Sequence, residues 1–247
     1  FLGGIDGAGA AVAAVERYGH AGIEQFAALD VPPGAHAVWA PLPDGALVYG
    51  GTASPTALRR VSTAGAVTAV DCATCADAWG ATGTALPSGG ALFLGGTDIT
   101  APPGWPQSGD MPATLGLLWA EGEPRLFRIA PPPCEGDACL AFAGVAEPRR
   151  YHAAARVDDG EAMLIAVHGG YTPATRTVRG DLYVLVCDAD CAEPQSPLVL
   201  ALAPVGASAI GPRCGHTMTP VRAARGRAIL VVGGFMNAGG CDLLDGG

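Results

Sequence analysis

The stretch Pro148–Leu185, PRRYHAAARVDDGEAMLIAVHGGYTPATRTVRGDLYVL, carries the pattern that decides the fold. A short run of mixed polar and apolar residues, Tyr151–Val157, ends at an Asp-Asp-Gly turn. A continuous apolar run, Ala162–Val167, ends before a Gly-Gly pair, and after a polar loop the run Asp181–Leu185 alternates with period two. Short runs separated by turn residues predict three antiparallel strands in a meander.

The apolar run that ends in two glycines recurs along the chain. The diglycines fall at residues 3–4, 50–51, 95–96, 169–170 and 233–234. The first two intervals are 47 and 45 residues, which is the length of a four-stranded propeller blade. A turn and another strand precede each later run, and two more strands follow the runs that end at residues 50, 95 and 169. The pattern therefore predicts four strands per unit.

A strand such as residues 91–96, ALFLGG, is apolar on both faces, so its sheet must be covered on both faces. Sheets arranged radially satisfy this and leave only short edges. We therefore expect an all-β fold, a β-propeller of four-stranded antiparallel blades in a single domain over residues 1–247, with about four to five blades represented. The expected units are a partial blade 1–30, blades at about 35–71, 80–130 and 150–203, and a partial blade 213–247.

Two points about the partial units stay open. The chain is either a fragment of a longer propeller, or residues 214–235 pair with the N-terminal strands to complete a smaller ring. The Ala-rich segment 8–29 fits two helices or two strands. We expect strands over 13–18 and 23–29, because Gly19 and Gly22 disfavour a helix and the repeat requires strands there.

The units resemble kelch repeats. The resemblance rests on a run of Pro-Arg, His, an apolar strand, a turn, an apolar strand ending in Gly-Gly, a loop and Asp-Leu-Tyr-Val, clearest in 148–185 and 212–235. It implies a kelch-like propeller, similar to the central domain of galactose oxidase. The family's tryptophan in the outermost strand is mostly missing, with Phe26 and Phe127 as possible replacements.

Net charge and hydropathy exclude some partners. The chain has a formal charge of −9 and a pI of about 4.9, whereas a nucleic-acid binder needs a basic face. No uninterrupted apolar run reaches the roughly 18 residues that a membrane-spanning helix needs. We therefore expect no nucleic-acid partner and no membrane span in this segment.

Six of the eight cysteines form close pairs in sequence. We predict four disulfides, Cys72–Cys75, Cys134–Cys139, Cys187–Cys191 and Cys214–Cys241. The last pair flanks a predicted hairpin whose first and last residues lie side by side. Even, local pairing indicates an oxidising compartment, so we expect an extracellular, periplasmic or cell-surface location. A zinc half-site or a redox pair at CATC, residues 72–75, is the alternative.

The histidines invite a metal interpretation, but we assign three of them to one repeat position. His36, His152 and His216 each open the first strand of a unit, which favours a structural role that bridges neighbouring blades. His168 and His20 have no second ligand at a useful spacing. We therefore expect no metal site, no cofactor and no catalytic residue, and we find no counterpart of the copper ligands of galactose oxidase.

Binding residues are expected in loops, which gather at the ends of a propeller. Aromatic residues and arginines are the usual anchors of binding surfaces. The candidates are Trp105, Arg149, Arg150, Tyr171, Arg176, Arg179 and Arg213. The opposing interpretation is that Trp105 packs within its own loop and the arginines are solvated.

The sequence therefore predicts a secreted or cell-surface kelch-like propeller that binds a protein or a glycan. The alternative is a kelch-propeller enzyme, either a copper oxidase or a sugar-modifying enzyme. The absence of a serine elbow, a phosphate loop or a zinc-helix motif from the sequence favours the binding module.

Overall fold

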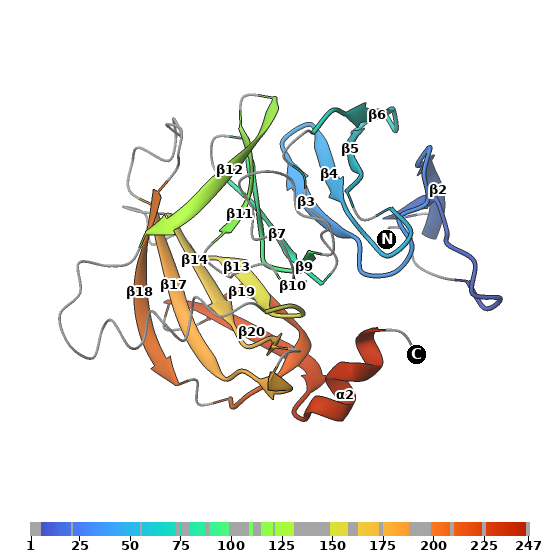
Figure 1. Cartoon of the computed structure of the whole chain (residues 1–247). Helices are drawn as coiled ribbons and strands as arrows, with labels where there is room; N and C mark the ends of the chain where they lie inside the picture. The colour runs from blue at the N-terminus through green and yellow to red at the C-terminus, as the bar shows by residue number, and fades with distance from the viewer. Residues whose placement is uncertain are drawn as a thin grey trace.

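The computed structural model is built almost entirely of β-strands (Figure 1). It describes residues 6–20, 22–54, 56–72, 75, 80–86, 89–98, 109–110, 115–120, 122–130, 149–157, 163–172, 175–187, 199–207, 210–223 and 226–245. None of the described helices is long and apolar enough to cross a membrane.

The first blade is a four-stranded antiparallel sheet in the order in which its strands follow along the chain. Its strands are β3 (Val38–Leu42), β4 (Gly45–Tyr49), β5 (Leu58–Ser62) and β6 (Val67–Val70). In β4, Leu47 and Tyr49 face the second blade, and Val48 packs on the opposite side. Both faces are therefore covered, as the continuous apolar run predicts.

The second and third blades repeat this order, with a small strand pair inside the loop that follows each diglycine. The second blade contains β7 (Thr82–Ala85), β8 (Ala91–Leu94), β11 (Leu115–Ala120) and β12 (Glu123–Ala130), and its loop contains β9 (Thr97–Asp98) and β10 (Gly109–Asp110). The third blade contains β13 (Ala153–Arg156), β14 (Met163–His168), β17 (Asp181–Cys187) and β18 (Val199–Ala207), and its loop contains β15 (Tyr171–Thr172) and β16 (Thr177–Val178).

The outermost strands of these two blades also pair with each other. β12 runs parallel to β18, with Arg128 opposite Val199, so the two blades form one eight-stranded sheet. The sequence does not predict this pairing. It ties the second and third blades together at their outer edge.

A two-stranded hairpin lies at each end of the described chain. The N-terminal hairpin is β1 (Ala14–Gly19) and β2 (Gly22–Ala28), which confirms strands over helices in this segment. The C-terminal hairpin is β19 (Cys214–Ala223) and β20 (Gly226–Phe235), followed by the short helix α2 (Ala238–Asp242) and a 3₁₀ turn, Leu243–Asp245. The two hairpins are separate sheets, so the structure does not show the pairing that would complete a smaller ring.

The innermost strands contact one another in succession and make the centre of the molecule. β3 contacts β7, β7 contacts β13 and β13 contacts β19, so each blade follows its neighbour around an axis (Figure 1). Between the first and second blades, the rings of Tyr49 and Phe93 meet edge to face at 5.3 Å. This arrangement of four-stranded antiparallel sheets confirms the predicted β-propeller.

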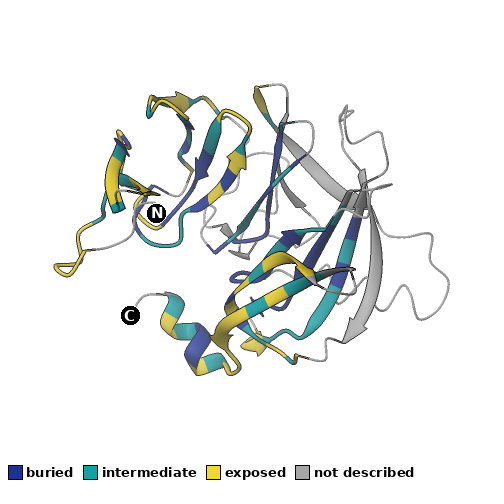
Figure 2. Ribbon diagram, turned by 180° about the vertical axis from the view of Figure 1, so that it is seen from behind, coloured by how far each residue is buried: buried dark blue, intermediate teal, exposed yellow. Residues whose placement is uncertain are grey.

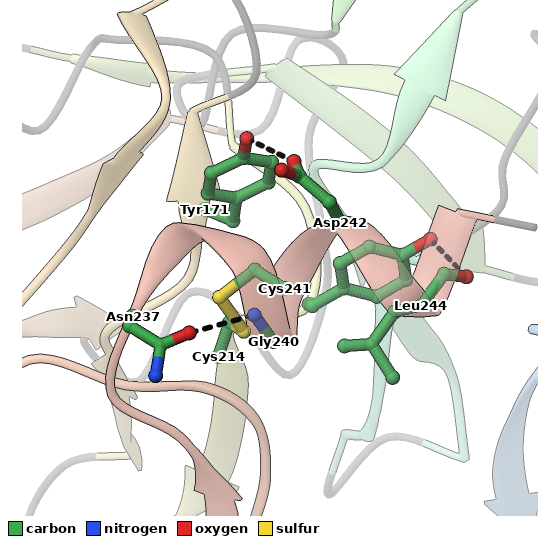
Figure 3. The surroundings of a disulfide bond; sticks show 8 residues. Tyr171, Cys214, Asn237, Gly240, Cys241, Asp242 and Leu244 are labelled. Atoms are coloured by element: carbon green, nitrogen blue, oxygen red, sulfur yellow. Dashed lines mark hydrogen bonds between the residues drawn. A yellow bond between two sulfur atoms is a disulfide. The ribbon is translucent and has the colours of Figure 1, made fainter. Parts of the chain in front are cut away.

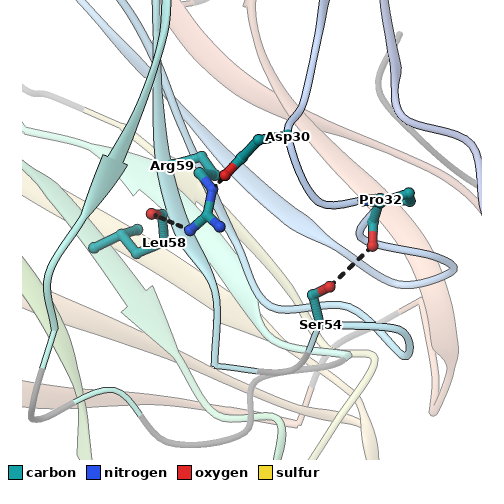
Figure 4. A network of polar contacts seen from close by, with 5 residues as sticks. All are labelled: Asp30, Pro32, Ser54, Leu58 and Arg59. Atoms are coloured by element: carbon teal, nitrogen blue, oxygen red, sulfur yellow. Dashed lines mark hydrogen bonds and ion pairs between the residues drawn. The ribbon is translucent and has the colours of Figure 1, made fainter.

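The segment between the N-terminal hairpin and the first blade is fixed by side-chain contacts (Figure 4). Arg59 donates from Nε to Asp30 Oδ1 at 2.5 Å, and Ser54 Oγ donates to the carbonyl of Pro32 at 3.0 Å. The hydrogen bond from Arg59 lowers the pKa of the Asp30 carboxyl. The segment that leads into the first blade is therefore fixed at two points, Asp30 and Pro32.

Candidate functional site

Each blade begins at a residue in the left-handed backbone conformation. These residues are His36, Gly80, Tyr151 and Gly215, with φ of 60°, 74°, 56° and 64°. Backbone hydrogen bonds join them across blades: Tyr151 N donates to Gly80 O at 2.7 Å, and Gly215 N donates to Tyr151 O at 2.8 Å. The starts of the inner strands thus form an arc of linked peptides at one end of the molecule, the loop end.

Strand register corrects the expected equivalence of the three histidines. Val38 pairs with Tyr49 and Ala153 pairs with His168, and Tyr49 and His168 each precede a diglycine. His152 therefore corresponds to Ala37, and His36 corresponds to Tyr151. The assignment of His36 to the same position as His152 and His216 is wrong by one residue. Unequal turn lengths between the paired strands concealed this offset in the sequence.

His152 and His216 do bridge neighbouring blades. His152 Nε2 lies 3.0 Å from Thr82 Oγ1 of the second blade, and His216 Nε2 lies 3.0 Å from His168 Nδ1 of the third. Each ring covers the diglycine of the preceding blade. A Cβ on Gly95 would lie 2.6 Å from His152 Cε1, and one on Gly169 would lie 3.0 Å from His216 Cε1.

The diglycines are required because backbones approach closely there, as expected. In the second and third blades, the second glycine of the pair donates across the blade boundary, from Gly96 N to Arg149 O at 3.1 Å and from Gly170 N to Arg213 O at 2.9 Å. A Cβ on Gly169 would lie 2.4 Å from Arg213 O. Both glycines of this pair also have positive φ, 68° and 103°, which disfavours any side chain.

Arg149 and Arg213 make the same internal contact in successive units. Arg149 Nη1 donates to Gly169 O, and Arg213 Nη1 donates to Gly233 O, each at 3.1 Å. Arg149 is fully buried, lies 2.8 Å from Asp181 Oδ2 and has its guanidinium 5.5 Å from the centre of the Tyr183 ring. Arg149 therefore clamps its own blade in this structure and does not reach the surface.

Burial lowers the pKa of the histidines at this boundary. Desolvation, with a smaller contribution from the Arg149 charge, lowers the pKa of His152 to about 3. Desolvation and the neighbouring His168 lower the pKa of His216 to about 4. His152 and His216 are therefore neutral near pH 7. In the hydrogen bond between His168 and His216, one ring donates its N–H and the other accepts it. Burial raises the pKa of the Tyr183 hydroxyl to about 12.

The loop end of the third blade carries a cluster of aromatic and arginine side chains. Arg150 lies with its guanidinium 5.6 Å from the centre of the Tyr151 ring and 6.0 Å from that of Tyr171. The Tyr151 ring also contacts His36, with ring centres 5.2 Å apart. A left-handed backbone is unfavourable for tyrosine but not for glycine, which stands at the equivalent positions 80 and 215. The presence of Tyr151 here therefore indicates that its side chain is required.

Helix α2 closes over this cluster (Figure 3). The Tyr171 hydroxyl donates to the carboxylate of Asp242. The Arg176 guanidinium donates to the same carboxylate, and the Tyr151 hydroxyl donates to Leu244 O at 2.9 Å. Asn237 caps the helix by accepting from Gly240 N at 2.7 Å. The cap and these contacts hold a segment, Ala-Gly-Gly-Cys-Asp, that has little helix propensity.

Disulfides fix both α2 and the end of the first blade. Cys214–Cys241 joins the first residue of β19 to α2, and both cysteines are fully buried. Cys72–Cys75 closes the connection after β6. These two predicted bridges are confirmed. Cys134, Cys139 and Cys191 lie outside the described residues, and only the backbone of Cys187 is described.

Around α2 lies a group of exposed side chains that sequence reasoning missed. Met236 is 63% exposed, and Ile210 and Phe235 are each 41% exposed. A Cβ on Gly240 of α2 would touch the Phe235 ring, and one on Gly211 would lie 3.8 Å from Met236 Cε. Together with Arg176, whose side chain is 67% exposed, these residues form what we call the loop-end patch. Only the diglycine register, which places residues 235–236 directly after Gly233–Gly234, signals this patch in the sequence.

The structure brings most of the predicted binding residues together. Arg150, Tyr171, Arg176 and Arg179 lie at the start and loop of the third blade, and Arg213 lies at the start of the next unit. Arg179 N donates to Gly170 O at 2.8 Å, so this loop returns to the diglycine. Trp105 lies outside the described residues. A binding role stays a prediction for all of them.

The described side chains include no group of three or more His, Cys, Asp or Glu residues placed to hold a metal ion. The polar groups at the loop end are mainly arginines, tyrosines and histidines, and the carboxylate of Asp242 accepts hydrogen bonds from two of them. The arginines and tyrosines donate hydrogen bonds, and the rings present aromatic surface. The arrangement is therefore suited to recognition of acceptor-rich and apolar surfaces.

Four-stranded antiparallel blades, linked at their loop end by peptide hydrogen bonds, define a β-propeller. No family model matches the chain. V(D)J recombination-activating protein 2 of Oncorhynchus mykiss is 29% identical over 140 residues, which cover 55% of this chain and 25% of that protein. The chain thus spans about a quarter of this curated relative. A fungal alcohol oxidase of the AA5 family, solved in complex with copper, superposes with a TM-score of 0.45 and 12% identity, over 87% of this chain and 50% of that one.

Proposed function

We propose that this chain is a single kelch-type propeller domain that acts outside the cytoplasm as a protein-binding module. The observation that carries the proposal is the loop-end patch, in which Met236, Phe235 and Ile210 are exposed beside Arg176. Exposed apolar side chains beside an arginine are typical of the centre of a protein interface.

The patch is held in a fixed geometry before any partner arrives. The carboxylate of Asp242 accepts hydrogen bonds from Tyr171 and Arg176, and the disulfide Cys214–Cys241 fixes α2 to the start of β19. A preorganised surface loses less entropy on binding than a mobile one. The same bridge, with Cys72–Cys75, supports an oxidising compartment and therefore a secreted or cell-surface location.

The experiment compares three immobilised proteins, the natural sequence, the double variant Arg176→Ala/Met236→Ala and the control Arg60→Ala. Arg60 is 42% exposed in its side chain and pairs with Asp44 in the turn between β3 and β4, at the opposite end of the blade from the diglycine. Each protein is probed with a displayed library of extracellular protein domains and with a glycan array. Equal unfolding midpoints are required before binding is compared.

We expect domains that the natural sequence and Arg60→Ala retain and that the double variant releases, with affinity lowered at least tenfold. If glycans and not protein domains are retained by the natural sequence and Arg60→Ala and released by the double variant, the ligand of the patch is a carbohydrate. Ligands held equally by all three proteins would show that the loop-end patch is not the binding site.

A further inference from the structure

Two donors from the loop of the third blade converge on one carboxylate. The Tyr171 hydroxyl donates to Oδ1 of Asp242, and the Arg176 guanidinium donates to Oδ2 of the same side chain. Each oxygen of this planar group thus receives one donor from a different residue. A hydroxyl and a guanidinium placed in this way fit a carboxylate of any origin, because an ionised carboxylate accepts hydrogen bonds through both of its oxygens.

The backbone at Arg176 has a conformation that is unfavourable for a residue with a side chain. Its φ is 51°, and the other described residues besides glycine with positive φ are His36 and Tyr151. The Tyr151 ring contacts His36, and its hydroxyl donates to Leu244 O, so all three strained residues belong to the loop end. Backbone strain of this kind gathers at ligand-binding sites, where it positions side chains. The strain therefore indicates that the position of the Arg176 side chain matters.

The Asp242 side chain can leave these donors without unfolding of its helix. It is 38% exposed and the Arg176 side chain is 67% exposed, so their ion pair is in contact with water. An exposed ion pair contributes little to the stability of a fold. The buried side of α2 is instead made by Gly240 and Cys241, and the disulfide to Cys214 fixes it (Figure 2). Rotation of the Asp242 side chain therefore frees both donors while α2 stays in place.

The surroundings of this carboxylate are rich in arginine, although the chain as a whole is acidic. The formal charge is −9, and the chain has 14 basic residues. Five of the 14 lie at the start and loop of the third blade and at the start of the next unit, namely Arg149, Arg150, Arg176, Arg179 and Arg213. Two described carboxylates, those of Asp181 and Asp242, pair with members of this group. A concentration of arginines on an acidic chain favours a partner that brings carboxylates to this surface.

We propose that Tyr171 and Arg176 form a binding site for an acidic side chain of a protein partner, and that Asp242 occupies this site in the free chain. The inference rests on the protein-binding function proposed above and names the chemistry of the partner. The exposed Phe235 contacts α2 and the exposed Met236 follows it, so the partner presents an apolar residue beside its Asp or Glu. The carboxylate of the partner takes the place of the Asp242 carboxylate, and no covalent bond changes.

The test removes the internal competitor. Asp242→Asn keeps the shape of the side chain but removes the charge that pairs with Arg176. Asp44→Asn is the matched control, because Asp44 forms an exposed ion pair with Arg60 at the opposite end of the first blade. The natural chain, these two variants and the double variant Asp242→Asn/Arg176→Ala each select from one displayed library of random peptides. Far-UV circular dichroism must show that all four proteins are folded.

We expect Asp242→Asn to enrich peptides that carry Asp or Glu beside an apolar residue. A purified peptide from this selection should bind Asp242→Asn about five- to tenfold more tightly than it binds the natural chain or Asp44→Asn, because no internal carboxylate competes. Replacement of the acidic residue of the peptide by its amide should weaken binding roughly tenfold, as should the loss of Arg176 in the double variant. Tyr171→Phe added to Asp242→Asn should weaken binding about fivefold.

Three results would overturn the proposal. They are the absence of acidic residues from the enriched peptides, equal affinity of such a peptide for Asp242→Asn and the natural chain, and acidic-peptide binding that survives the loss of Arg176. The binding function and the carboxylate site can fail separately. Domains released by Arg176→Ala/Met236→Ala, without a preference for acidic peptides, would retain the function and reject the site. If neither domains nor peptides depend on Arg176, both are rejected.

Discussion

The contacts between neighbouring units differ in kind at the two ends of the arc. Where the third blade meets the C-terminal hairpin, the contact is polar and directional, through Gly170 N to Arg213 O, His168 to His216 and Tyr171 to Asp242. Where the N-terminal hairpin meets the first blade, the buried contact is apolar, through Ala27, Leu29, Val48 and Val61, and the polar contacts of Arg59 and Ser54 fix only the segment after the hairpin. The polar contact specifies one geometry, whereas the apolar one leaves an open groove beside it.

This difference shows that one repeat supports both a locked and an open boundary. Buried donors and acceptors cost free energy unless they are paired, so a polar boundary tolerates little displacement. An apolar boundary loses only the area that is uncovered. The following substitutions test whether the polar boundary is the more demanding of the two.

The largest expected effect is that of a methyl group placed at the locked boundary. Gly169→Ala should lower the free energy of unfolding by about 4 kcal/mol, because the added Cβ meets Arg213 O and the backbone is left-handed. Gly233→Ala is the matched control, since its φ is +74° but nothing lies within 4 Å of the added atom. It should cost about 1 kcal/mol. Urea unfolding measures both, and equal losses would show that crowding is unimportant here.

Removal of the disulfide at the same boundary should come next. Cys214→Ser/Cys241→Ser opens a loop of 27 residues, which corresponds to about 3.5 kcal/mol of chain entropy. Cys72→Ser/Cys75→Ser opens a loop with a separation of 3, which corresponds to about 1.6 kcal/mol. The ranking by thermal unfolding is the prediction, and a reversed order would contradict it.

Acid should weaken the locked boundary through its neutral histidines. The pKa of His152 is about 3 in the folded chain, below the 6.5 of an unfolded one, so the unfolded chain binds the additional proton. Its stabilising contribution is complete above pH 6.5 and is lost as the pH falls toward 3. Between pH 6.5 and 5 the loss from His152 is about 2 kcal/mol.

The test measures unfolding free energy against pH in two variants. His152→Gln should remove that part of the slope while keeping an amide donor toward Thr82. His20→Gln is the control substitution, because His20 is exposed in a turn. An unchanged slope in His152→Gln would refute the assignment.

The smallest effect concerns the hydroxyl groups. Tyr171→Phe removes the donor to Asp242 and should cost about 1 kcal/mol. Tyr183→Phe should stay within about 0.5 kcal/mol, because the Tyr183 hydroxyl has no hydrogen-bond partner among the described atoms. Thermal unfolding compares the two, and a larger loss from Tyr183→Phe would indicate a partner for its hydroxyl.

The sequence predicted the blades because their information is local. Apolar runs, turns and diglycines recur along the chain, and those within the described residues correspond to strands, turns or close backbone approaches in the structure. The parallel pairing of β12 and β18 was missed because it joins distant segments and leaves no periodic signature. Helix α2 was missed because its stability comes from Asn237, Cys214 and Asp242 contacts and not from propensity.

The candidate site was predicted less well than the fold. Arg149 was placed among surface residues because arginine is rarely buried, but the structure buries it completely. A signal was present, since Arg149 and Arg213 share a repeat position just as His152 and His216 do. The reasoning that assigned the histidines a structural role therefore applied equally to these arginines.

The amide-to-carbonyl links at Gly96 and Gly170 have a consequence for how such a molecule can lengthen. Because they need only peptide groups and two glycines, a newly duplicated unit docks on its predecessor before any of its side chains has adapted. The second blade has Ala81 where the third has His152, and its inner strand β7 still contacts β3 of the first blade. Tandem duplication can thus add units first and chemistry afterwards.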